Sequence, residues 1–216
     1  MAVKSNLLNM SLMLTLTCLV CSGILGGAYV ITKEPIEAAK AAKINKANAA
    51  VLPAFETSER GETVLKDEAG VETPYVYYKA VNGEELVGYA IESNVSGFGG
   101  NLKILVGITA DGLIYDTDVL DNNETPGLGA KCAESGSLFR TQWQKLDPRE
   151  RILTLKKDGG DIDAITASTI TSRAYTQAVY NAVQVFDALT GGEADAATGA
   201  SVPAENNNKE ESSDEQ

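Results

Sequence analysis

The chain has 216 residues, enough for one ordinary domain with attachments, and its formal net charge is -12. This acidic balance would repel a phosphate backbone, so we expect no nucleic acid among its partners. The sequence contains no histidine, which excludes Ser/His/Asp and Cys/His nucleophiles and removes the commonest transition-metal ligand. We therefore name no catalytic residue and no metal site.

The first element is an uncharged apolar run from Leu7 to Ile31, about as long as a helix that crosses a hydrocarbon core of roughly 30 Å. It predicts an N-terminal transmembrane anchor over residues 1–32. A cleaved signal peptide is the alternative, because Gly26-Gly27-Ala28 resembles a small-residue cleavage site, but the run exceeds the usual signal core of about 7 to 15 residues. The flanking lysines do not decide which side of the membrane the rest of the chain occupies.

Cysteine usage gives no disulfide framework, since Cys18 and Cys21 lie inside the apolar run and Cys132 stands alone in the rest of the chain. Cys18 and Cys21 form a CxxC pattern. Small residues that face lipid or neighbouring helices are the simpler interpretation of this pair. An iron or cluster shared with other subunits stays open.

Residues 33–60 are interpreted as a juxtamembrane helical linker. This stretch is rich in Ala and Lys at helical spacing. Pro35 stands near its start and Pro53 near its end, where helices commonly begin and stop.

Residues 61–190 are expected to form the folded domain, which begins with two predicted hairpins. Each hairpin pairs two strand-like runs across a two-residue turn signal. Four consecutive strands of this kind predict an antiparallel meander. The runs and turns, in chain order, are Tyr75–Ala80, Asn82-Gly83, Leu86–Glu92, Leu102–Thr109, Asp111-Gly112 and Leu113–Leu120.

Two helices and one further strand are predicted after the hairpins. Ser137–Gln144 is read as a short helix that carries the only tryptophan, and Arg151–Lys156 as another strand. From Thr169 to Leu189 apolar residues recur at helical spacing, so we expect a helix that packs on the sheet and stops at Gly191-Gly192.

The predicted fold class is α+β: a single N-terminal transmembrane helix followed by an antiparallel twisted sheet flanked by helices. Residues 191–216 follow this domain. They are strongly acidic and hold almost nothing to bury, so they are expected to be a disordered acidic tail.

Hydroxyl side chains crowd the segment Asp163–Ser172, DAITASTITS, where the last helix is expected to begin. One hydroxyl is enough to cap a helix, which is worth about 1 kcal/mol. Because a helix start offers free N–H groups and a favourable dipole, the surplus also fits a phosphate site. Spacing alone favours capping, and both interpretations stay open. The hydroxyl residues are Thr166, Ser168, Thr169, Thr171 and Ser172.

Glu124–Gly129, ETPGLG, is a turn by composition, and a plain surface loop is its simplest interpretation. Taken with the hydroxyl segment, however, it resembles part of a known family. This family comprises the flavin-bearing extracytoplasmic subunits of ion-pumping redox complexes. Its members include the G subunit of the Rnf complex and its relative, the C subunit of the sodium-translocating NADH:quinone reductase.

That family carries FMN joined through its phosphate to a threonine in the motif Asp-x-x-Ser/Thr-Gly-Ala-Thr. Asp163–Thr169 is similar to this motif, with Thr169 at the acceptor position. The chain departs from it at Ala167, where the family has Gly, and at Ser168, where it has Ala. The resemblance also covers the order of the other segments and reaches nearly the whole chain outside the tail. These segments are Val106–Gly112, Val119-Leu120, Glu124–Gly129 and Thr171–Ala174.

The resemblance implies a set of cofactor-binding residues. Thr169 would carry FMN covalently as a phosphoester. Thr166 and Ser168 would cap the helix or bind the phosphate. Asp163 would be part of the motif that the flavin transferase recognises during attachment. Backbone groups of the glycine-rich loop would approach the flavin ring. The loop residues named for this role are Glu124, Thr125, Gly127 and Leu128.

Three aromatic side chains could also neighbour the flavin ring. We interpret Phe98, Tyr115 and Trp143 as core packing and name none of them as a site.

The function implied by the resemblance is an electron relay with covalently bound FMN, in a membrane complex that couples ferredoxin/NAD electron transfer to ion translocation. Such a chain is one part of a complex rather than an enzyme on its own. Its partners would be the other subunits of the Rnf-type complex, the flavin transferase during maturation, and the cell membrane, with the FMN domain on the extracytoplasmic side. The alternatives are a membrane-tethered extracytoplasmic binding module without a redox cofactor, and a flavinylated protein working alone in an outward electron-export chain.

Overall fold

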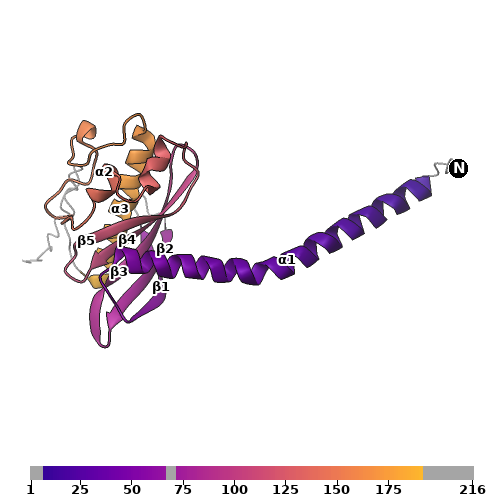
Figure 1. Ribbon diagram of the computed structural model, residues 1–216, viewed down its shortest axis with the longest axis horizontal. Helices are drawn as coiled ribbons and strands as arrows, with labels where there is room; N and C mark the ends of the chain where they lie inside the picture. The colour runs from indigo at the N-terminus through magenta and orange to yellow at the C-terminus, as the bar shows by residue number, and fades with distance from the viewer. Residues whose placement is uncertain (1–6, 67–71, 192–216) are drawn as a thin grey trace, which may run out of the picture. The chain divides into compact units, whose positions relative to one another are not determined.

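A computed structural model describes residues 7–66 and 72–191 (Figure 1). The chain divides into two compact units, with the division between Ala47 and Asn48. The tail expected over 191–216 lies outside the described residues apart from Gly191.

Helix α1, Leu7–Val51, is one continuous element with Pro35 inside it. The predicted span and the predicted juxtamembrane helix are therefore parts of the same helix, because leucine-rich and alanine-rich sequence both favour helical backbone. By length and composition, α1 is long and apolar enough to cross a membrane. It ends two residues before Pro53, which cannot continue a helix.

The second unit is built on a five-stranded sheet in the order β1-β2-β3-β4-β5, in which each strand pairs with the next. All four pairings are antiparallel. The predicted meander is confirmed, with one strand more than the sequence pattern suggested. The strands are β1 Thr57–Lys66, β2 Glu72–Asn82, β3 Glu85–Ser96, β4 Asn101–Thr109 and β5 Ile114–Asn122.

Strand β1 was not predicted, although it pairs with β2 along its whole length, from Thr57 opposite Val81 to Lys66 opposite Glu72. It forms an edge of the sheet, and its side chains are exposed or half-buried. A strand without a buried face carries little hydrophobic alternation, which is the pattern used to recognise strands.

Helix α3, Thr169–Thr190, packs on the sheet over β3 and β4 (Figure 1). Its buried face carries small residues such as Ala174, Ala178 and Ala182, which allow the helix to approach the sheet closely. It stops at Gly191, whose φ of 66° is a left-handed conformation that glycine adopts without strain. The predicted helix, its stop and the α+β fold class are confirmed.

Helix α2, Leu138–Thr141, is shorter than the predicted helix over Ser137–Gln144. Trp143 lies just after it and is fully buried. Its ring stacks on Tyr175 at a centroid distance of 5.9 Å and meets Phe139 edge-on at 6.3 Å. Core packing is confirmed for Trp143, whereas Tyr115 is only half-buried.

The strand predicted over Arg151–Lys156 is wrong. This stretch forms a loop that leads into the short 3-10 helix η2, Lys156–Asp158, and makes only one isolated bridge, from Leu155 to Ile162. Leu153 and Leu155 are buried in the core. The alternating apolar side chains of this segment are thus buried from a loop rather than from a strand of the sheet.

Candidate functional site

Two segments of the predicted site meet at one cavity of about 360 Å³, called here the motif cavity. Its size falls within the range of about 300 to 1,000 Å³ usual for small-molecule sites. Three chain segments form it: the turn between β3 and β4, the ETPGLG loop and the start of α3. The lining residues are Phe98, Glu124, Thr125, Leu128, Gly129, Ala167, Ser168, Thr169, Ile170 and Thr171.

The start of α3 presents unpaired backbone N–H groups to this cavity. Ala167 has a φ of 60°, a left-handed turn that directs the chain into the helix. Ser168 occupies the N-cap position, but its side chain makes no capping hydrogen bond. Within the described residues the N–H groups of Thr169, Ile170 and Thr171 therefore have no acceptor. They form the positive end of the helix dipole, which favours an anion.

The hydroxyl side chains divide into engaged and unengaged groups. Thr171 Oγ1 donates to Glu124 Oε2 at 2.8 Å. Ser172 Oγ donates to Ser168 O at 2.8 Å and accepts from Ile165 N at 2.9 Å. Thr169 is half-buried at the cavity, and its hydroxyl makes no hydrogen bond with the described residues.

The expectation that Ser168 and Thr166 would cap the helix is not met. Ser168 is buried without a side-chain cap bond, and Thr166 is exposed and precedes the cap position. The alternative that they bind a phosphate stays a prediction. Ser168 is the better placed of the two, because it lines the cavity and Thr166 does not.

Glu124 connects the three segments that form the motif cavity. Its Oε1 accepts from Phe98 N at 2.8 Å and from Gly99 N at 3.4 Å, while Oε2 accepts from Thr171. The side chain is buried. The carboxylate is thus satisfied by donors from two segments distant in the sequence.

The ETPGLG loop closes on itself through Thr125, whose carbonyl accepts from Leu128 N at 3.2 Å and from Ala130 N at 3.1 Å. Gly127 has a φ of 75°, so the turn needs a residue without a side chain there. Thr125 and Leu128 line the cavity, and Gly127 does not.

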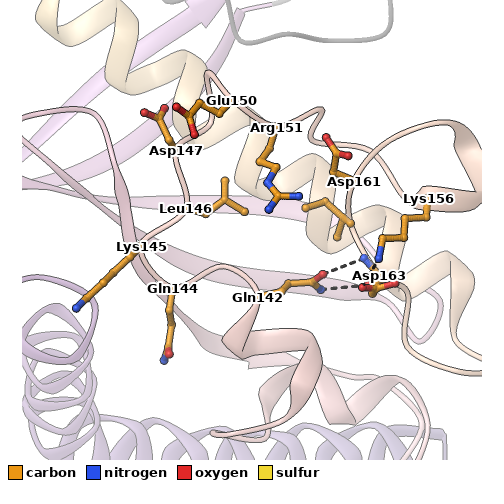
Figure 2. A pocket seen from close by; sticks show the side chains of 11 residues that line it. Gln142, Gln144, Lys145, Leu146, Asp147, Glu150, Arg151, Lys156, Asp161 and Asp163 are labelled. Atoms are coloured by element: carbon orange, nitrogen blue, oxygen red, sulfur yellow. Dashed lines mark hydrogen bonds and ion pairs between the residues drawn. The ribbon is translucent and has the colours of Figure 1, made fainter.

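Asp163 lies at another cavity, of about 500 Å³, called here the polar cavity (Figure 2). Its Oδ2 forms an ion pair with Lys156 Nζ at 2.7 Å. Gln142 holds its backbone from both sides, donating to Asp163 O at 3.1 Å and accepting from Asp163 N at 2.8 Å. The structure therefore separates Asp163 from the residues at the motif cavity.

The polar cavity is larger but is the weaker candidate site. Figure 2 shows Asp163 and Gln142 bonded to one another at its edge. Asp161 Oδ2 is also engaged, accepting from Ile152 N at 2.8 Å. The residues that line this cavity include none of the motif hydroxyls, so we place the candidate site at the motif cavity.

Several lining residues were not predicted. Phe98 was expected in the core, but 67% of it is exposed at the motif cavity, so that expectation is wrong. A signal was present, since Gly97-Phe98-Gly99-Gly100 interrupts the strand pattern with an aromatic residue among glycines. Four further lining residues were not among the predicted cofactor-binding residues: Gly129, Ala167, Ile170 and Thr171.

Cys132 lies close to the site but is not part of it. It is fully buried, and burial, followed by the charge of Glu124, raises the pKa of its thiol to about 11. The thiol therefore stays protonated near neutral pH and is a poor nucleophile.

Comparison with known proteins identifies a family model that covers the segments of the motif cavity. Residues 97–184 match the family model described as an FMN-binding domain, and this stretch contains Phe98, the ETPGLG loop and the hydroxyl segment. The matched residues begin just before β4 and reach into α3, so the family model covers the carboxyl-terminal part of the sheet and the helix that packs on it.

Relatives identify the family more narrowly. The chain is 33% identical over 182 residues to the G subunit of the proton-translocating ferredoxin:NAD(+) oxidoreductase complex of Clostridium ljungdahlii, covering 83% of this chain and 91% of that protein. It is 30% identical over 196 residues to the G subunit of the ion-translocating oxidoreductase complex of Shewanella baltica, covering 86% and 92%. The chain belongs to the family of G subunits of Rnf-type ion-translocating oxidoreductases, which confirms the resemblance seen in the sequence.

A third relative is the G subunit of the Na(+)-translocating ferredoxin:NAD(+) oxidoreductase complex of Acetobacterium woodii. It is 37% identical over 135 residues, covering 58% of this chain and 63% of that protein. The relatives thus include complexes named for protons and complexes named for sodium ions.

Proposed function

We propose that this chain is the flavin-carrying subunit of a membrane complex that transfers electrons between ferredoxin and NAD and moves ions, with FMN attached to Thr169 through a phosphoester. The names of the relatives from Clostridium ljungdahlii and Acetobacterium woodii support the reaction. A bound FMN supplies the redox chemistry, while the protein holds it and sets its surroundings. This role needs no histidine.

The observation that carries the attachment site is the state of the Thr169 hydroxyl. It lies at the first residue of α3, lines the motif cavity and makes no hydrogen bond with the described residues. The neighbouring hydroxyls of Thr171 and Ser172 already have partners within the fold. Ser168 also lines the cavity without a side-chain hydrogen bond among the described residues, but it is buried, whereas Thr169 is half-buried and more accessible to a transferase.

The ester would join Thr169 Oγ1 to the phosphorus of an FMN group that the transferase supplies as a phosphoanhydride. The O–H bond of Thr169 and the anhydride bond to that phosphorus would break, and the leaving phosphate-bearing group would depart as the hydroxyl loses its proton.

The other lining groups fit a flavin phosphate and ring. No Lys or Arg lines the motif cavity, so the N–H groups at the start of α3 would supply the donors for the phosphate. Phe98, Leu128 and Ile170 are exposed apolar residues at the cavity, where an apolar ring would cover them. The negative charge of Glu124 is already met by donors within the protein.

The attachment site is tested by expressing the full chain together with the flavin transferase and measuring its mass and colour. Thr169→Ala should lose the FMN mass and the yellow colour, yet fold normally, because no hydrogen bond of the described residues is lost. Ser168→Ala is the matched control and should keep both. If Thr169→Ala retained covalent flavin while Thr171→Ala or Ser168→Ala lost it, the acceptor would be assigned to the wrong residue.

Asp163 is proposed to act during attachment, as a group that the flavin transferase reads. Its side chain is largely exposed and stands at the polar cavity rather than beside Thr169. Asp163→Ala should therefore slow FMN attachment without changing the spectrum of the flavin that does attach. A normal rate of attachment by purified transferase would remove this role.

The proposed location is the cell membrane, with α1 as a retained single span and the FMN domain on the extracytoplasmic side. The length and composition of α1 support the span. A membrane-impermeant thiol label applied to intact cells should reach a cysteine introduced at exposed Asn94. Labelling only after lysis would place the domain in the cytoplasm.

A further inference from the structure

The walls of the motif cavity come from segments far apart in the sequence, and Glu124 is the side chain that joins them. One carboxylate oxygen accepts from Phe98 N at 2.8 Å, and the other accepts from Thr171 Oγ1 at 2.8 Å. Thr171 belongs to the first turn of α3, which also carries Thr169. A single buried group therefore links the turn that carries Phe98 to the helix start.

The surrounding glycines are needed to admit this carboxylate. A Cβ atom added at Gly97 would collide with Glu124 Oε1. A Cβ atom at Gly129 would collide with Glu124 Oε2 and with Thr171 Oγ1. The glycine at the end of the ETPGLG loop thus makes room for a carboxylate, which differs from the expectation that these glycines serve close approach of the backbone to the flavin.

The Phe98 turn has few other restraints. It lies among Gly97, Gly99 and Gly100, and it is closed by one backbone bond, from Gly97 N to Gly100 O at 2.7 Å. Glycines leave a backbone with many accessible conformations. The bond from Phe98 N to Glu124 restrains this backbone and so limits the positions that the exposed phenyl ring can reach.

We propose that Glu124 is the positioning residue of the flavin site, holding Phe98 and the first turn of α3 in fixed relation so that the phenyl ring packs on the isoalloxazine ring. The contact with the flavin rests on the proposed function, whereas the positioning of Phe98 does not. Glu124 acts through Phe98 N and Thr171 and exchanges no proton or electron in this role.

The first test uses the full chain expressed without the transferase, so that no flavin is attached. Hydrogen exchange of the Phe98 amide should be about tenfold faster in Glu124→Ala, because its acceptor is lost. Glu124→Gln should restore protection, since its carbonyl oxygen can accept from Phe98 N. Amides in the middle of β4 are the control for general unfolding.

Thr171→Val covers the case in which Glu124→Ala fails to fold. This substitution removes the hydroxyl that donates to Glu124 Oε2 and changes the side-chain volume little. Because Glu124 can still accept from Phe98 N, hydrogen exchange of the Phe98 amide should rise by a smaller factor than in Glu124→Ala. Unchanged Phe98 exchange in folded Glu124→Ala, or in Thr171→Val if the first variant does not fold, would overturn the positioning role. This result is independent of whether any flavin attaches.

The second test measures visible circular dichroism and fluorescence of the attached flavin. Phe98→Ala and Glu124→Ala should change both signals in the same direction, the double variant should add little, and Glu124→Gln should resemble the unmodified chain. Leu138→Ala is the control, because Leu138 is exposed but does not line the cavity. A flavin signal altered by neither variant would overturn the contact, and additive effects would overturn the coupling. Absence of flavin from every form, including the unmodified chain, would instead count against the proposed function.

Discussion

The motif cavity and the polar cavity stand at the two ends of one segment, Asp163–Thr171, and they differ in whether the motif residue at each is already bonded within the protein. At the polar cavity Asp163 is paired with Lys156 and held by Gln142. At the motif cavity the Thr169 hydroxyl makes no hydrogen bond with the described residues. The motif residue at the larger cavity is thus engaged within the protein, and the hydroxyl at the smaller one is not.

The motif cavity also has more exposed apolar surface around it than the polar cavity. Phe98, Leu128 and Ile170 expose apolar surface at the motif cavity, whereas charged and amide side chains dominate the lining of the polar cavity (Figure 2). A ligand gains affinity by covering apolar surface and by meeting donors that lack partners. Exposed apolar surface together with the unpaired N–H groups at the start of α3, rather than volume, therefore favours the motif cavity as the candidate site.

The largest effect should come from filling the space around Glu124. Gly129→Val would drive a branched side chain into Glu124 and Thr171, and we expect a loss of about 3 kcal/mol in the free energy of unfolding. Gly127→Ala is the matched control in the same loop, because its φ is positive but nothing lies near its Cβ position. Backbone strain alone should cost it about 1 kcal/mol.

Thermal and urea unfolding of the full chain in detergent would measure both variants. Each should keep covalent flavin if it folds, since neither supplies the acceptor hydroxyl, and Gly129→Val should alter the flavin spectrum more. Equal destabilisation by the two substitutions would show that Gly129 is an ordinary turn residue. The packing of Glu124 and Thr171 against Gly129 would then not be what holds the motif cavity together.

A smaller effect, a gain in the free energy of unfolding, is expected from a substitution at Ala167. Its φ of 60° is unfavourable for a residue with a side chain, so Ala167→Gly should stabilise the domain by about 1 kcal/mol. Ala164→Gly, in the same segment but without a positive φ, should be slightly destabilising. The measurement is the shift in the unfolding midpoint, and a destabilised Ala167→Gly would contradict the strain.

The smallest effect is expected at the polar cavity. Lys156→Ala removes an ion pair whose side chains are both largely exposed, so stability should change by about 0.5 kcal/mol and less at high salt. FMN attachment should be unchanged. If Lys156→Ala abolished attachment, the polar cavity would belong to the attachment site and the distinction between the two cavities would fail.

Short-range features of the fold could be predicted because they depend on neighbouring residues. Gly83 and Gly112 adopt positive φ values of 62° and 86° at the predicted hairpin turns, and α3 stops at Gly191 as its sequence indicates. Strand β1 could not be predicted, because its place depends on pairing with β2 rather than on its own pattern. The loop over Arg151–Lys156 imitates a strand only because its leucines alternate.

In the candidate site, too, some features followed from local sequence and others only from the tertiary structure. By itself, the sequence determined the helix start and the hydroxyl-rich segment, since these are read from neighbouring residues. The acceptor role of Thr169 came from the family resemblance and stays a proposal. Only the tertiary structure decided which hydroxyls are engaged, because the partner of Thr171 is Glu124, 47 residues away. It likewise brought Phe98 to the cavity and separated Asp163 from it, through contacts between segments that no local pattern records.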